Sequence, residues 1–157
     1  ASRGEVWVDE TMLPRERFLE VIANAPLVSI DLIVRSRQGD VLMGWRRNEP
    51  ARDHWFVPGG RICKGETVED AFGRLCLEEL GFAMTLEATR LVGVFTHLYD
   101  NNFAGVEGVS THYVVIAYEV LVEPDLSTLP TSQHRNYKWV SPSGDLSGVH
   151  PNSIAYL

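Results

Sequence analysis

Residues 58–82 constrain the fold of this chain more than any other part of the sequence. The segment begins with a Pro-Gly-Gly turn, and glycine adopts backbone angles that are closed to other residues. Thr67 and Asp70 then have the spacing of a capping box, and apolar residues recur at helical spacing until Gly81 supplies a C-terminal stop. The pattern predicts a loop followed by an amphipathic helix that ends at Gly81.

Two adjacent glutamates, Glu78 and Glu79, occupy the final turn of this helix. The helix dipole disfavours each negative charge there by about 0.3 to 1 kcal/mol. Glu79 also projects between Phe72 and Leu75 and interrupts the apolar face of the helix. A metal site explains this placement, because Mg²⁺ takes hard oxygen ligands from carboxylates and phosphates. In the alternative interpretation, Glu78 pairs with Arg74 and Glu79 turns to solvent as the helix frays.

The rest of the chain reads as several short strands with few helices. Pro14 begins a short amphipathic helix that ends near Asn24, and a turn at Gly39 joins two strands into a hairpin. The expected strands are residues 27–34, 41–45, 55–57, 91–97, 112–121 and 137–140. Residues 1–12 read as an irregular arm. This mixture predicts an α+β fold, an α/β/α sandwich, in a single domain that spans residues 1–157.

Charge and composition exclude several classes of function. The net charge of −7 and the absence of a Lys/Arg run argue against a nucleic-acid partner. No apolar run approaches the roughly 20 residues that cross a bilayer, and the charged N-terminal segment is unlike a secretory signal. Cys63 and Cys76 are too few to staple a chain of this size. We expect a cytoplasmic protein that binds neither nucleic acid nor membrane but holds small anions through arginines.

A spaced set of residues begins at Gly60 and continues with Glu66, Arg74, Glu78, Glu79, Gly81 and Phe82. The set resembles the Nudix box, G-x5-E-x7-R-E-U-x-E-E-x-G-U, where U is a bulky apolar residue. The resemblance implies an α/β/α sandwich with a mixed sheet, in which the box forms a loop, a helix and a second loop. It also implies that the terminal glutamates hold Mg²⁺ near a substrate diphosphate. Glu66 and Arg74 would tie the loop to the helix.

Leu75 stands where the Nudix box has a glutamate that commonly ligates metal. The same replacement is a feature of the GDP-mannose mannosyl hydrolase branch of the family. Further segments similar to that branch lie at residues 27–31, 55–61, 97–103, 111–113 and 133–134. The similarity covers most of the chain from residue 15 onward. Glu78 is a second departure, because a small residue can occupy this place in that branch.

The resemblance implies one Mg²⁺ per subunit, with Mn²⁺ as a substitute. The Gly59 carbonyl, Glu79 and Gln133 would bind the metal, and Glu78 would be a further ligand. His134 would be the general base, since an imidazole with an unperturbed pKa of about 6.5 accepts a proton near neutral pH. Without the resemblance, Gln133 and His134 read as ordinary loop residues.

Five residues resemble substrate contacts of the same branch. Arg46 and Arg61 would bind the diphosphate and stabilise it as a leaving group. Asp31 and His97 would contact the sugar and phosphate side of the substrate, and Tyr113 would donate to a phosphate oxygen. Without the resemblance, the arginines read as solvated and the other three as polar or packed residues of a sheet.

The leading interpretation is a Mg²⁺-dependent homodimeric hydrolase of a small nucleotide sugar, GDP-mannose above all, in which water attacks the anomeric carbon with inversion. The runner-up is an ordinary Nudix pyrophosphatase that cleaves the P–O bond of an NDP-sugar or a nucleoside triphosphate. Leu75 and the Gln133-His134 pair favour the first reaction, whereas Glu78 favours the second. A non-catalytic nucleotide-sensing domain is a third possibility, and the retained glutamates of the box count against it.

Overall fold

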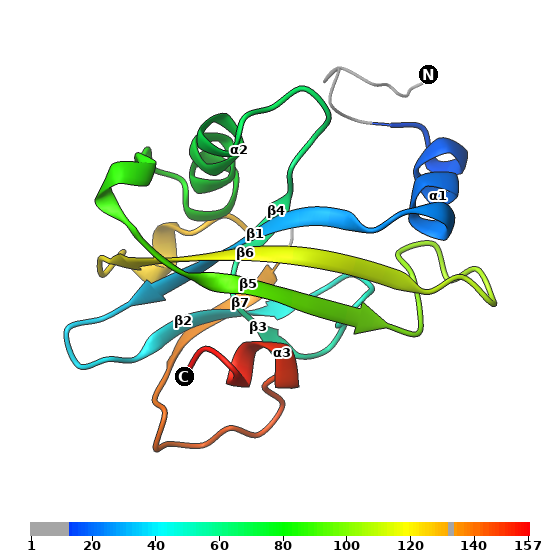
Figure 1. Cartoon of the computed structure of the whole chain (residues 1–157). Helices are drawn as coiled ribbons and strands as arrows, with labels where there is room; N and C mark the ends of the chain where they lie inside the picture. Colours follow the sequence, from blue (N-terminus) through cyan, green and yellow to red (C-terminus); the bar gives the residue numbers. More distant parts are fainter. Residues whose placement is uncertain (1–12, 132–133) are drawn as a thin grey trace.

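A computed structural model describes residues 13–131 and 134–157, except for the side chain of Arg135. Seven strands of this described part form one mixed sheet in the order β3-β2-β1-β6-β5, with β4 paired to β1 and β7 to β2. The sheet lies between α2 on one face and α3 on the other (Figure 1). The predicted α+β fold, an α/β/α sandwich with a mixed sheet, is therefore confirmed. The arm expected at residues 1–12 lies outside the described residues.

Most elements fall close to their expected positions. The helices are α1 (Arg15–Asn24), α2 (Val68–Leu75) and α3 (Pro151–Ile154). The strands are β1 (Leu27–Arg35), β2 (Val41–Arg46), β3 (Trp55–Phe56), β4 (Gly59–Arg61), β5 (Arg90–Tyr99), β6 (Thr111–Leu121) and β7 (His134–Val140). Two differences concern the site. The Pro-Gly-Gly turn enters the sheet as β4, and β7 begins three residues earlier than expected, at His134.

Strand β1 is the centre of the sheet. It pairs in parallel with β6 over its whole length, from Leu27 opposite Tyr113 to Arg35 opposite Leu121. The expected hairpin of β1 and β2 separates after its turn, because the two strands pair only at Arg35 and Val41. Beyond that point β4 pairs with β1, while β2 pairs with β3 and β7. The sheet is thus split into one half built on β1 and another built on β2, and the two halves meet where Arg35 pairs with Val41.

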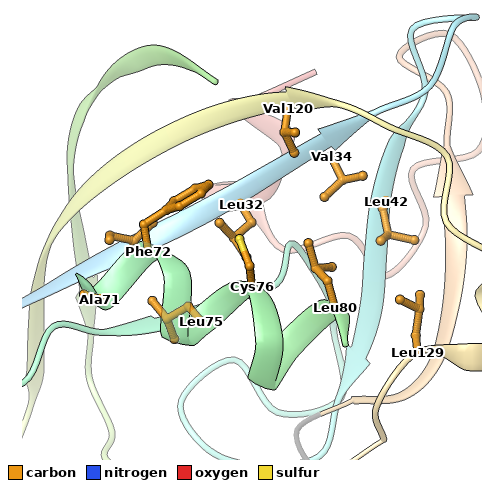
Figure 2. Close-up of a cluster of buried hydrophobic side chains, with 11 residues drawn as sticks. Leu32, Val34, Leu42, Ala71, Phe72, Leu75, Cys76, Leu80, Val120 and Leu129 are labelled. Carbon is orange, nitrogen blue, oxygen red and sulfur yellow. The ribbon is translucent and has the colours of Figure 1, made fainter. Parts of the chain in front are cut away.

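Two hydrophobic cores fill the sandwich. On the α2 face, Phe72 and Leu75 are buried against Leu32, Val34 and Val120 of the sheet (Figure 2). The opposite core gathers Ile33, Met43, Phe56, Val140, Val149 and Tyr156. No helix in the described part of the chain has the length and apolar character needed to cross a membrane.

The helix after the loop begins and ends as the sequence predicts, but its last turn widens. The side chain of Thr67 accepts a hydrogen bond from the Asp70 amide at 3.0 Å, which caps α2. The helix then continues as a π-helical turn, Cys76–Leu80, closed by Gly81 at a φ of 82°. A π turn changes the direction of the side chains that follow. It buries Leu80 and Glu79 together beneath the helix end.

We predict that Phe72→Ala lowers the free energy of unfolding by about 3 to 5 kcal/mol, because it leaves a cavity in a fully buried core. The matched control is Leu77→Ala in the adjoining π-helical turn, where the side chain is 56% exposed. This control should change the free energy by no more than about 0.5 kcal/mol. Denaturant titration of both variants measures the difference, and equal losses would contradict the assigned packing.

Candidate active site

A pocket between the two halves of the sheet brings together six residues that the sequence analysis selected. They are Asp31, Arg46, Gly59, Arg61, His97 and Tyr113. Five strands supply them: β1, β2, β4, β5 and β6. Phe56, Val57 and Tyr99 add apolar and aromatic wall. We call this cavity the deep pocket.

A wider groove adjoins the deep pocket along the end of α2. The two cavities share five lining residues: Arg46, Gly59, Gly60, Arg61 and Tyr113. The groove, which we call the outer groove, adds Glu78 and Glu79 from the π-helical turn. Arg46 and Arg61 therefore lie between Glu78 and Glu79 of the outer groove and the aromatic wall of the deep pocket.

An ion pair fastens the loop to α2. Arg74 Nε donates to Glu66 Oε2 at 2.7 Å, and Arg74 Nη2 donates to Glu66 Oε1 at 2.9 Å. Arg74 Nη2 also donates to the Arg61 carbonyl at 2.8 Å, and the Cys63 amide donates to Glu66. The hydrogen bond from Arg74 lowers the pKa of Glu66. This network fixes the backbone at Arg61, as the resemblance implies.

The two glycines of β4 allow backbone and side chains to approach more closely than any other residue permits. A Cβ at Gly60 would lie 2.5 Å from Leu75 Cδ2. A Cβ at Gly59 would clash with the Ile30 carbonyl and lie 2.8 Å from Asp31 Oδ1. The β4 strand therefore lies directly against β1 and α2, which places the Gly59 backbone beside Asp31.

The two glutamates of the final turn have different surroundings. Glu78 is half exposed and accepts from Arg74 Nη1 at 3.0 Å, as the alternative interpretation expected. That interpretation is wrong for Glu79, which is only 6% exposed instead of turning to solvent. Burial raises the pKa of Glu79 to about 7, and its Oε1 has no hydrogen-bond partner among the described residues.

The surroundings of Glu79 fit a divalent cation, although the described residues contain no group of three or more His, Cys, Asp or Glu side chains that could hold a metal. One oxygen of the buried carboxylate, Oε1, lacks a partner among the described residues, whereas a hydrogen bond from the Gly59 backbone lowers the pKa of the carboxylate in part. A bound cation would supply the missing partner and favour the ionised carboxylate. Gln133, the third expected ligand, lies outside the described residues.

His134 is placed differently from the expected loop histidine. It is the first residue of β7, opposite Arg46 of β2, and only 1% of its surface is exposed. Its ring lies against Gly44, where a Cβ would clash with Nδ1, and its Nε2 is 3.8 Å from Glu79 Oε1. Burial and then Arg46 lower the pKa of this imidazole from its ordinary value near 6.5 to about 4. The imidazole is therefore neutral at physiological pH, and its contact with Glu79 is not an ion pair.

Comparison with known proteins decides the family. The model of the NUDIX domain matches residues 25–145. The chain belongs to the Nudix family. It is 43% identical to the low-salt glycan biosynthesis protein Agl8 of Haloferax volcanii over 157 residues, which are 99% of this chain and 96% of that protein.

Solved Nudix structures share the fold. A MutT NUDIX hydrolase from Burkholderia pseudomallei is 26% identical, with a TM-score of 0.64 over 83% of this chain and 94% of that one. A MutT protein from Methanosarcina mazei is 22% identical, with a TM-score of 0.58 over 76% and 80% of the two chains. The protein is therefore a Nudix hydrolase, and enzymes of this family generally use a divalent metal such as Mg²⁺.

Leu75 distinguishes this Nudix site from the usual box. Its side chain is almost fully buried and packs beneath Gly60 in the core below α2. The place of a common metal-binding glutamate is thus taken by a core residue. Two of the box glutamates that commonly ligate metal therefore remain in this chain. Glu79 is buried, and Glu78 lies half exposed in the outer groove.

Sequence reasoning missed three residues that shape the deep pocket. Tyr99 lies two residues after His97 on β5, and this spacing places both on one face, so the pattern could have identified it. Tyr156 donates to Asp31 Oδ2 at 2.7 Å, and Asn152 donates to the Tyr99 hydroxyl at 3.2 Å. No local pattern marks these two, since they act across more than 50 residues of sequence.

We predict that Arg74→Lys lowers the free energy of unfolding by about 1 to 3 kcal/mol, because lysine cannot reproduce the paired contacts to Glu66 and the Arg61 carbonyl. Arg37→Lys is the control, since Arg37 is highly exposed and pairs with Glu123 at 3.6 Å. The control should cost less than about 0.5 kcal/mol. If thermal and denaturant unfolding show no difference between the variants, the network does not hold the loop.

Proposed function

We propose that this Nudix hydrolase cleaves a nucleotide sugar, with GDP-mannose as the leading substrate, by attack of water at the anomeric carbon. The burial of Leu75 beneath Gly60 carries the proposal. Attack at phosphorus in the usual Nudix site draws on several carboxylates that hold metal, and this chain has a leucine at one of those places. The site keeps what the departure of a diphosphate requires, namely a buried carboxylate and two arginines.

The relative from Haloferax volcanii supports a sugar substrate. Its name assigns it to glycan biosynthesis, and it aligns with almost the whole of this chain. Nucleotide sugars are the common activated donors of such pathways. The deep pocket also suits a hexose, because it combines aromatic walls at Phe56, Tyr99 and Tyr113 with polar groups at Asp31 and His97.

In the proposed complex the diphosphate occupies the outer groove. Arg46 and Arg61 donate to its oxygens and stabilise the charge that develops as the glycosidic C–O bond lengthens. Arg46 lines both cavities, and its buried Nε has no partner among the described residues. Tyr113 lines both cavities and would donate to a phosphate oxygen. Mg²⁺, held by Glu79, the Gly59 carbonyl and Gln133, would neutralise the leaving diphosphate.

His134 is proposed as the group that accepts the proton from water. Its low pKa keeps the imidazole neutral at working pH, which is the form that a base requires. Its Nε2 lies 3.8 Å from Glu79 Oε1, so this ring nitrogen is the one that would accept a proton from water beside that carboxylate. The residue is buried beside Glu79 and lines neither cavity, so water must reach it next to that carboxylate.

Cleavage at phosphorus is the competing function, and one observation favours it. Glu78 lines the outer groove near Glu79 and remains half exposed. If Glu78 leaves Arg74, the groove gains a second carboxylate for metal. The bond that breaks therefore decides between the two functions.

We predict that hydrolysis of GDP-mannose in ¹⁸O-water places the label in mannose and not in GDP. A single displacement inverts the anomeric centre, so the first product should be β-mannose from the α-linked donor. Mass spectrometry locates the label and NMR identifies the anomer. A panel of other nucleotide sugars and nucleoside triphosphates serves as the comparison. Label in a phosphate, or mannose 1-phosphate among the products, would establish the pyrophosphatase reaction instead.

We predict that Glu79→Gln lowers kcat by about 100-fold or more while the fold is kept, because it removes the charge of the buried metal ligand. The matched control, Glu69→Gln, lies exposed in the first turn of α2 and should leave the rate and the Mg²⁺ dependence unchanged. Steady-state rates across a Mg²⁺ titration measure both. Normal turnover by Glu79→Gln with unaltered Mg²⁺ dependence would refute the metal assignment.

A further inference from the structure

The last part of the chain packs behind one side of the deep pocket and supports residues that line it. We call residues 146–157 the C-terminal segment; it includes α3 and lies across the face of the sheet opposite α2 (Figure 1). Three of its residues hydrogen-bond to pocket residues: Tyr156 to Asp31 at 2.7 Å, Asn152 to Tyr99 at 3.2 Å, and Ser153 to the Val57 amide at 3.1 Å. All three partners line the pocket. The segment therefore touches the pocket wall at three separate points.

The segment is held at both ends, so these contacts are fixed in place. At its start, the Trp55 amide donates to the Gly148 carbonyl and the His150 amide donates to the Trp55 carbonyl, at 2.8 and 3.0 Å. At its end, Arg35 Nη2 donates to the Tyr156 carbonyl at 3.0 Å. Arg35 is itself paired with Glu119 at 2.6 Å. Tyr156 is thus tied to β1 through its backbone and through its hydroxyl.

The contact between Tyr156 and Asp31 determines how the carboxylate is presented. Both side chains are almost fully buried, and Tyr156 is the hydrogen-bond donor that the described part of the chain offers to Asp31. The hydroxyl engages Oδ2, while Oδ1 lies above Gly59 at the pocket wall. The second oxygen therefore faces the Gly59 backbone of β4 at the pocket wall. A ligand hydroxyl in the pocket would therefore meet the Asp31 carboxylate in the one orientation in which Tyr156 holds it.

We propose that Tyr156 and Asn152 are positioning residues that decide which sugar the deep pocket accepts. The inference rests on the proposed function, because it assumes that a hexose occupies this pocket. Epimeric hexoses differ in the direction of a single hydroxyl, and a site built to hydrogen-bond that hydroxyl rejects the epimer that leaves its polar groups unpaired. A carboxylate fixed by Tyr156 and a phenol fixed by Asn152 supply such a site.

The hydroxyl of Tyr156 can be separated from the structural role of its ring. The ring packs edge-on against Phe95 at 5.2 Å and belongs to the core on this face of the sheet. Tyr156→Phe keeps this packing and removes only the donor to Asp31. Tyr118→Phe is the matched control, since Tyr118 packs its ring against Phe72 on the opposite face and lines neither cavity.

The test measures sugar discrimination with the nucleotide held constant. For each variant, kcat/KM is determined for the preferred nucleotide sugar and for an epimer on the same nucleotide, together with Ki for the nucleoside diphosphate product. Tyr156→Phe should lower the ratio of the two kcat/KM values by about 10-fold, mainly through KM. The Ki of the diphosphate should stay within about twofold, because that ligand has no sugar. Asn152→Ala should reduce the ratio in the same direction, and Tyr118→Phe should leave it unchanged.

Each outcome decides the inference. An unchanged ratio in Tyr156→Phe and Asn152→Ala would overturn it while the proposed function stands. Parallel losses of sugar discrimination and diphosphate binding would show a merely structural role and also overturn it. If the wild-type enzyme cleaves no nucleotide sugar, the proposed function is wrong and the inference fails with it. If Tyr156→Phe does not fold, the Asn152→Ala ratio alone decides.

Discussion

The close approach of β4 to β1 and α2 is the constraint on which the rest of the site depends. Only glycine fits at Gly59 and Gly60, because a Cβ at either position would overlap the Ile30 carbonyl or Leu75. This approach sets the Gly59 backbone beside Asp31 and lets Leu75 close the core beneath it. Without it, β4 could not pair with β1 and the loop after it would not reach the arginine that fastens it to the helix.

The second feature of the site is that several ionisable groups are buried without a full set of hydrogen-bond partners. Asp31 and Glu79 have pKa values raised to about 7, and His134 has its pKa lowered to about 4, in each case mainly through loss of solvent. Glu79 Oε1, His134 Nδ1 and Arg46 Nε lack partners among the described residues. Unsatisfied buried groups of this kind cost stability, and they concentrate at sites where a ligand completes the set.

Much of the fold could be read from local patterns. The capping contact at Thr67, the stop at Gly81 and the strand periods are short-range features, and the structure agrees with them. The Nudix box likewise marked Glu66, Arg74 and Glu79 through fixed spacing. Three features depend on distant partners and had no local signal. The β1–β2 hairpin forms at its turn but opens beyond it, Glu79 is buried in a π-helical turn, and His134 lies in a strand instead of a loop.

The sequence by itself determined the family, the mixed α+β architecture and the residues that can carry charge at the site, because these follow from spacing within short segments. The tertiary structure alone decided how those residues are presented. Burial depends on packing between elements far apart in the chain, so the pKa values of Glu79 and His134 had no local signal. The same holds for Tyr156, which reaches Asp31 across 125 residues. Such a contact exists only after the sheet has formed and the last helix has packed on its open face.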